Sequence, residues 1–433
     1  MSIGSPIPKV INQKVPNQII SLYRGQAELI DDKLRILGRV EVEIQWHPFP
    51  NISIKFMFDG KEDVSSYFKI RLLDLIPQRN MEVKYTGGIW YGTGKAELFG
   101  ELRKPFIQGV TKNLHTITFS VVNFFWFDIS NDDDFYYDEQ DNEVDIQKER
   151  WLLFDGQFIF DYDNWHIVIG TLDSGWEREE KLEAQGGFAV THICKIEHLD
   201  DTSIDNKVAR EVIHAFCFYL SFIRGFWIAP LLLCGFDKDA SQIFEEWGTP
   251  TIKADTWQSR GYSWTTPDTT ECVSYFSGFM EKWKNEKWHG VIKDSIQWYI
   301  ESAKHTNGHN TSIILVQAAL EKLAWTYLST NEYLTADGFK KLTFADKVRL
   351  MLKILGVEII QLQPDSEITK FIKANNVKDN VDIIAQVRNH LIHPTVTKKQ
   401  NQLEISETMI VETFEVAHYY SLKSLLKIFG FSN

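Results

Sequence analysis

The stretch VEVEIQWHPFPNISIKFMF, Val40–Phe58, carries the pattern that decides the fold of the first part of the chain. Apolar residues alternate strictly with polar ones from Val40 to Trp46, and every second position is again apolar from Ile52 to Phe58. A period of two places every second side chain on the same face of a β-strand. The stretch therefore predicts two strands with one buried face each, joined by a turn at HPFPN.

Further segments of the first two hundred residues are also typical of strands. They are ITFSVVNFFWF, QFIFDYDNWHIVIG with a hairpin turn near Asp163 and Asn164, and GFAVTHICKIEH. Several short strands at such spacing favour a sandwich-like or barrel-like sheet. We therefore expect an α+β protein, in which a β-rich, sandwich-like N-terminal domain precedes an all-α helical bundle.

The segment GGIWYGTGKAE resembles a nucleotide-binding loop only superficially. A phosphate-binding P-loop requires glycine five positions before the Gly-Lys pair and serine or threonine after it. Ile89 and Ala96 occupy those positions here. We interpret the segment as a β-hairpin.

The segment from Ala215 to Phe236 is apolar over about the length that spans a bilayer. Arg224 falls near its centre, and Gly225 and Pro230 interrupt it. We expect a helix that ends at Arg224, followed by a buried strand, and no membrane partner.

Composition and charge limit the classes of function. The N-terminus lacks the basic and apolar regions of a signal peptide, which indicates a cytoplasmic protein, and the four cysteines are expected to be buried free thiols. The net charge is −13, but from residue 281 onward 19 Lys and Arg accompany 17 Asp and Glu. Only this last part is electrostatically permissive for a polyanion.

An acidic segment, Asn131–Asp145, has eight carboxylates in fifteen residues. It is interpreted as a solvated loop held extended by repulsion between like charges. Two alternatives stay open: the segment could mimic a polyanion that occupies a basic RNA site, or it could bind calcium, although it lacks the EF-hand spacing.

The chain becomes helical in pattern near residue 281. Five segments with helical periodicity and mostly short connections favour a four- or five-helix bundle. We predict a β-rich domain over residues 1–200, a helix, strands and a connection over 201–280 that pack on it, and the bundle over 281–433.

The fourth of these segments contains QVRNHLIHP, Gln386–Pro394, with four polar side chains close together. Asn389 and His393 lie four residues apart on one helix face, and the long side chain of Arg388 can reach them. A guanidinium group clamps phosphate oxygens, an amide orients a ligand, and an imidazole transfers protons near neutral pH. The motif therefore indicates phosphate chemistry.

Arg388-Asn389, three residues and then His393, near the end of a helical bundle, resembles the RNxxxH signature of the HEPN superfamily. The layout of a long β-rich region before the bundle resembles ApeA-type anti-phage proteins. The resemblance implies a homodimer with one composite site, metal-independent cleavage of RNA, including tRNA, and a need for no cofactor. It also implies a role as a toxin-like effector in antiviral defence or abortive infection, released by a phage-derived or cellular trigger.

In the implied reaction, the ribose 2′-OH attacks the adjacent phosphorus while histidines act as general base and acid and arginines stabilise the phosphate charge. Glu321 is a candidate for orienting Arg388, and His390 is a second supporting residue. His390 and His393 also form an HxxH pair, but no nearby Cys or carboxylate set completes a metal site. Three alternatives stay open: a catalytically silent HEPN protein that binds nucleic acid or a partner, a carbohydrate- or peptide-binding β-sandwich fused to a dimerisation bundle, and an architectural role in which Arg388 pairs with an acid such as Glu321.

Overall fold

The computed structural model describes residues 13, 15–31, 34–62, 64–75, 79–124, 157–172, 175–258, 269–304, 308–392 and 405–430. The chain folds into two compact units. The first comprises Met1–Leu220, Trp227–Arg260 and Pro267–Thr269, and the second comprises Ser221–Phe226, Gly261–Thr266 and Thr270–Asn433. A β-rich region thus precedes a helical one, as predicted. The domain limits predicted at residues 200 and 280 stay predictions.

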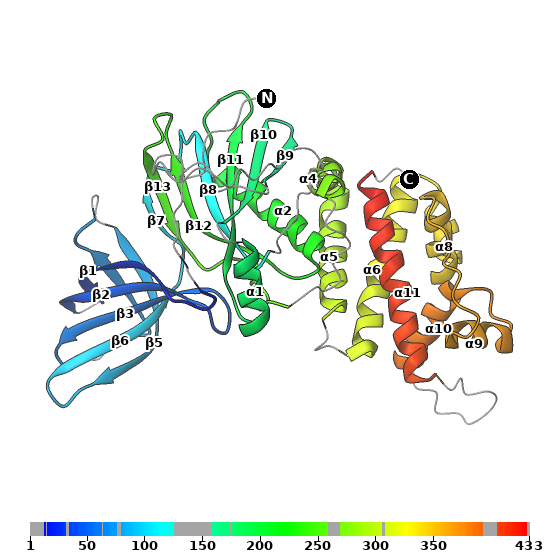
Figure 1. The fold of residues 1–433 in the computed structure, drawn as a ribbon, viewed down its shortest axis with the longest axis horizontal. Helices are drawn as coiled ribbons and strands as arrows, with labels where there is room; N and C mark the ends of the chain where they lie inside the picture. The colour runs from blue at the N-terminus through cyan, green and yellow to red at the C-terminus, as the bar shows by residue number, and fades with distance from the viewer. Residues whose placement is uncertain are drawn as a thin grey trace, which may run out of the picture. The chain divides into compact units, whose positions relative to one another are not determined.

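The first unit begins with a closed antiparallel barrel of six strands in the order β1-β2-β3-β6-β5-β4 (Figure 1). The predicted alternation is confirmed, because Val40, Ile44 and Ile54 are fully or almost fully buried in its core. The segment GGIWYGTGKAE forms the hairpin between β5 and β6, also as predicted. The strands are β1 (Ile20–Ile30), β2 (Arg35–Gln45), β3 (Asn51–Asp59), β4 (Tyr67–Leu72), β5 (Asn80–Trp90) and β6 (Lys95–Leu102).

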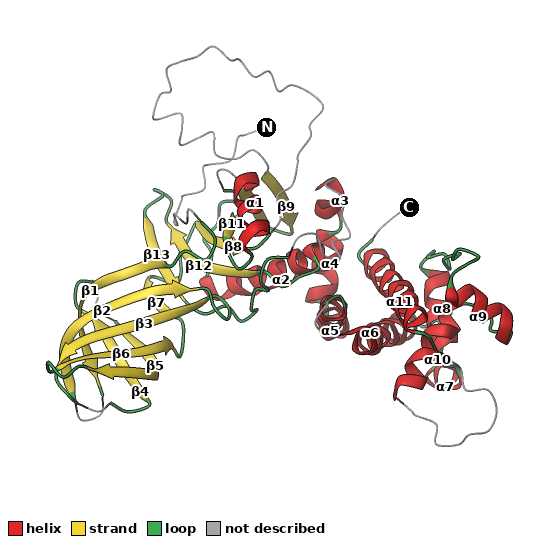
Figure 2. Ribbon diagram, turned by 60° about the horizontal axis from the view of Figure 1, so that its bottom comes forward, coloured by secondary structure: helices red, strands yellow, loops and turns green. Residues whose placement is uncertain are grey.

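A separate seven-stranded sheet follows, in the order β7-β13-β12-β8-β11-β10-β9 (Figures 1 and 2). The sandwich-like arrangement expected from the sequence is thus replaced by a closed barrel and a second sheet. Strand alternation reports only which side chains are buried; it does not report whether a sheet closes on itself. The strands are β7 (Phe106–Gly109), β8 (Thr116–Val122), β9 (Gln157–Tyr162), β10 (Trp165–Thr171), β11 (Val190–His198), β12 (Ala229–Phe236) and β13 (Gln242–Trp247).

Two helices belong to this part of the chain, α1 (Gly175–Gln185) and α2 (Asn206–Arg224). Helix α2 packs on the sheet, where the ring centroid of Phe216 lies 5.1 Å from that of Phe160 in β9. It ends at Arg224 as predicted, since Gly225 has a φ of 75°, and the buried strand β12 follows. No helix within the described residues is long and apolar enough to cross a membrane.

The four cysteines are free and buried, as predicted. Burial raises the pKa of the Cys234 thiol to about 12, so it stays protonated at neutral pH. The acidic segment Asn131–Asp145 lies outside the described residues, so its interpretation stays a prediction.

The second unit is helical, and α6 packs against α5, α8, α10 and α11 (Figure 1). Helix α6 presents an apolar stripe to these neighbours, since Ile313, Val316 and Leu320 are fully buried. The helices are α3 (Thr269–Ser274), α4 (Phe276–Lys284), α5 (Glu286–Ser302), α6 (Gly308–Thr330), α7 (Ala336–Lys341), α8 (Phe344–Ile354), α9 (Glu367–Asn375), α10 (Asn380–Ile392) and α11 (Glu407–Ile428).

Candidate functional site

Arg388, Asn389 and His390 of the predicted motif lie near the end of helix α10, which ends at Ile392. The other face of this helix is apolar and buried, with Ile384 and Val387 fully enclosed against neighbouring helices. Arg388 is half-buried, whereas Asn389 and His390 are exposed. The packing of α10 therefore turns the polar residues of its last turn toward the surface.

An ion-pair cluster holds the beginning of α10. Arg349 of α8 donates to both carboxylate oxygens of Asp379, at 2.7 and 2.9 Å, and to Asp382 at 3.0 Å. Burial is the largest single influence on the pKa of Asp379 and opposes its ionisation. The hydrogen bonds and positive charge of Arg349, together with the backbone N–H groups of Val381 and Asp382, nevertheless hold the pKa of that carboxyl below its usual value. Because Asp382 belongs to α10, the cluster ties this helix to α8.

A buried hydrogen-bond network provides a second attachment. The hydroxyl of Tyr420 in α11 donates to Asn380 Oδ1 at 2.8 Å and accepts from the backbone N–H of Ile360 at 3.0 Å. Asn380 Nδ2 in turn donates to the carbonyl of Ile360 at 2.9 Å. Burial raises the pKa of Tyr420 to about 12, so the network keeps its proton at physiological pH. These bonds fix the first residue of α10 between α11 and the loop that joins α8 to α9.

The far end of α10 has different surroundings. Arg388 Nη1 donates to Asn389 Oδ1 at 3.1 Å, and within the described residues the guanidinium makes no ion pair. A guanidinium with four further N–H donors thus stands beside an amide at the helix end. This arrangement can bind an anion with planar oxygens, such as a phosphodiester.

The other predicted site residues are Glu321, His390 and His393. Glu321 is exposed on α6, and among the described residues it makes no ion pair with Arg388; its neighbour Lys322 pairs with Asp294 of α5. His390 is exposed next to Asn389. His393 lies outside the described residues. In the part of the chain that the structure describes, no three His, Cys, Asp or Glu side chains gather as a metal site would require.

Sequence reasoning missed the residues that orient α10. Arg349 is separated from Asp379 by thirty positions, and Asn380 from Tyr420 by forty, so no local pattern links them. It also missed His418 of α11, which is 5% exposed and stacks on Tyr299 with ring centroids 4.1 Å apart.

These observations define a class: a β-rich unit with a closed barrel, followed by a helical unit that exposes an arginine–asparagine pair at the end of a firmly held helix. Comparison with known proteins finds relatives of this chain. Residues 285–433 match the family model of the YopA C-terminal domain, and residues 109–259 match that of the YopA central domain. The helical unit and the seven-stranded sheet therefore each resemble a domain of YopA.

The similarity extends over most of the chain for one relative. The SPbeta prophage-derived uncharacterized protein YopA of Bacillus subtilis (strain 168) is 24% identical over 402 residues, which cover 88% of this chain and 83% of the relative. No solved structure matches the chain.

Proposed function

We propose that this chain is a metal-independent endoribonuclease effector of the HEPN type. In this proposal the helical unit cleaves RNA as a homodimer, while the β-rich unit senses a trigger or restrains cleavage. One observation carries the proposal: Arg388 and Asn389 stand at the surface end of α10 without an ion-pair partner among the described residues, while the opposite end of the helix is held by two networks. A binding group on a rigid support is what phosphate chemistry requires.

The chemistry assigned to the motif uses its three side chains in different roles. Arg388 remains protonated at any physiological pH and stabilises the charge that develops on the phosphate. Asn389 shares a hydrogen bond with Arg388 and keeps the guanidinium at the helix end. His393, which follows the last residue of α10 in sequence, transfers protons as general base or acid.

The setting of the reaction is proposed from the relative. The name of the Bacillus subtilis protein records a prophage origin. We place this chain likewise in a phage-related context, as a cytoplasmic effector of antiviral defence or abortive infection. RNA is the substrate class, and tRNA is the first substrate to test.

The test compares purified wild-type protein with His393→Ala. Both are incubated with total RNA and with tRNA in EDTA, and the new ends are examined for 2′,3′-cyclic phosphate. We expect cleavage by the wild type and a loss of about 100-fold or more in the variant, the range over which general acid–base residues act. Growth arrest is scored in cells that express each protein, with and without phage infection, because a restrained enzyme is released only by its trigger.

The control is Lys373→Ala, which removes an exposed positive charge from the neighbouring helix α9. It should cleave like the wild type. If the wild type neither cleaves RNA nor arrests growth, with or without phage infection, the nuclease proposal fails and the catalytically silent alternative is favoured.

A further inference from the structure

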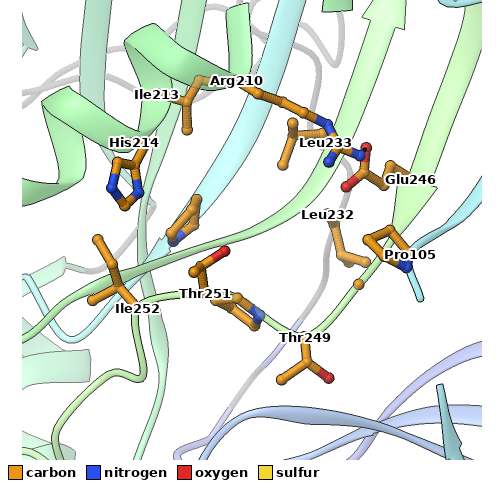
Figure 3. Close-up of a pocket in the computed structure, with 13 residues that line it drawn as sticks. Pro105, Arg210, Ile213, His214, Leu232, Leu233, Glu246, Thr249, Thr251 and Ile252 are labelled. Atoms are coloured by element: carbon orange, nitrogen blue, oxygen red, sulfur yellow. Dashed lines mark hydrogen bonds and ion pairs between the residues drawn. The ribbon is translucent and has the colours of Figure 1, made fainter. Parts of the chain in front are cut away.

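The first unit contains a small cavity between α2, the strands β12 and β13, and the segment after β13 (Figure 3). Its volume is about 130 Å³. Thr249 and Thr251 are exposed at its opening, whereas Ile213 and Leu233 form part of an apolar wall and are buried. A cavity of about 150 Å³ with apolar walls accommodates one six-membered ring, so the space suits a small monocyclic molecule.

One side of the cavity is polar. Arg210 extends from α2 to Glu246 of β13 and forms an ion pair with it (Figure 3). Burial raises the pKa of the Glu246 carboxyl, while Arg210 and a hydrogen bond from Asn206 counteract that rise. The Arg210 side chain is 36% exposed and lines the cavity, so its remaining Nη N–H groups can donate to a ligand that supplies a carbonyl oxygen.

The backbone of the cavity wall is distorted. Leu232 has a φ of 51°, which places it in the left-handed region that residues with a side chain seldom adopt. It is 4% exposed and lines the cavity, and the pairing of β12 with β8 shifts register between Leu231 and Cys234. Bulges and strained residues of this kind recur beside binding sites, where they re-aim side chains. This irregularity is independent of the ion pair and points to the same cavity.

We propose that the cavity binds a small neutral heterocycle that carries an N–H group beside a C=O group, as a pyrimidine base does. The ligand carbonyl accepts from an Nη N–H group of Arg210, and the ligand N–H donates to the carboxylate of Glu246. Arg210 and Glu246 already neutralise each other, so a charged ligand would be buried without a counter-charge and is disfavoured. This inference goes beyond the proposed function, because it assigns a ligand site to the β-rich unit whether or not the helical unit cleaves RNA.

The experiment titrates uracil, thymine and 2-pyridone into the full chain and follows binding by calorimetry and by saturation-transfer NMR. For a ligand of this size we expect a Kd of about 1 mM or below. The matched ligand is 1,3-dimethyluracil, which keeps both carbonyls but has lost its N–H groups. It should bind about tenfold more weakly or worse, because the Glu246 carboxylate then loses its donor.

Two variants locate the site on the protein. Thr251→Trp places a large ring at the opening from an exposed position, and its control is Thr256→Trp, an exposed position outside the cavity lining. Glu246→Gln removes the acceptor charge, and its control is Glu211→Gln, an exposed carboxylate on α2. Both cavity variants should weaken uracil binding about tenfold or more, and both controls should bind like the wild type.

Three results would overturn the proposal. The first is the absence of binding by all three heterocycles at concentrations well above about 1 mM. The second is equal binding of uracil and 1,3-dimethyluracil. The third is undiminished binding by Thr251→Trp in a protein whose circular dichroism and Tm match those of Thr256→Trp.

Discussion

Two arginines of the helical unit occupy opposite surroundings. Arg349 is 16% exposed in its side chain and donates to three carboxylates, those of Asp346, Asp379 and Asp382. Arg388 has an amide as its hydrogen-bond acceptor and faces the surface. The hydrogen bond to Asp379 raises the pKa of Arg349 further above its ordinary value, together with that to Asp382. One arginine therefore stabilises the fold at the beginning of α10, and the other is available to bind a ligand at the end of the helix.

The largest expected effect concerns activity. Arg388→Ala should lower RNA cleavage by about 100- to 1,000-fold, the range measured when one group that stabilises a developing oxyanion is removed. The Tm should stay within error of the wild type, since the side chain makes no ion pair in the described structure. Single-turnover cleavage of tRNA, with a parallel thermal melt, measures both. A lower Tm with unchanged cleavage would show that Arg388 is architectural.

Substitution of the other arginine, Arg349, should change the stability of the helical unit. Arg349→Ala leaves two acidic side chains of the cluster at α10 without their cation, and breaking a largely buried ion pair costs about 3 kcal/mol. Urea unfolding of the full chain should show a lower midpoint for the transition of the helical unit. Lys353→Ala, an exposed position also on α8, is the control. An unchanged midpoint in Arg349→Ala would remove the contrast between the two arginines.

Local patterns in the sequence located helices and strands better than they predicted which of them pair or pack together. Strict alternation around Val40 and the glycine after Arg224 each act within a few residues, so strands and a helix end could be located. Barrel closure depends on pairing between β1 and β4, which are distant in sequence, and alternation contains no information about it. Helix α9 has a local cap in Ser366, but a distant residue also holds it, because Glu412 of α11 accepts from two backbone N–H groups of its first turn, at 3.1 and 2.9 Å.

The same distinction between local and long-range information applies to the candidate site. Its helical position followed from the spacing of the motif, because residues four apart share a face whatever the rest of the chain does. What holds α10 in place did not follow, because Asn380 and Tyr420 meet only after folding. The buried imidazole of His418 likewise belongs to a helix predicted correctly, but its burial depends on Tyr299 of another helix.

That buried histidine gives a pH-dependent prediction. Burial lowers the pKa of His418 to about 4, whereas an unfolded histidine titrates near 6.5. Between these values the unfolded chain binds a proton that the folded chain does not. The free energy of unfolding therefore falls as the pH drops from about 7 to about 4, and this histidine does not affect it above about pH 7. The loss approaches about 3 kcal/mol at the low end.

The measurement uses His418→Phe, which keeps an aromatic ring against Tyr299 and removes the titrating group. The free energy of unfolding of the helical unit should fall less steeply with acid in this variant than in the wild type. NMR titration of the wild type checks the cause directly. A His418 resonance that titrates near the unfolded value of about 6.5 would contradict the prediction.

The smallest expected effect is at Glu321. This carboxylate is exposed on α6 and within the described residues makes no ion pair with Arg388, so Glu321→Gln should change the free energy of unfolding by less than about 0.5 kcal/mol and leave RNA cleavage unchanged. Asp294→Asn is the contrasting variant, because Asp294 pairs with the adjacent Lys322. In the proposed homodimer a second copy could bring its own Arg388 to Glu321. A loss of cleavage in Glu321→Gln as large as that in Arg388→Ala, with an unchanged Tm, would identify Glu321 as a positioning residue that acts across the dimer.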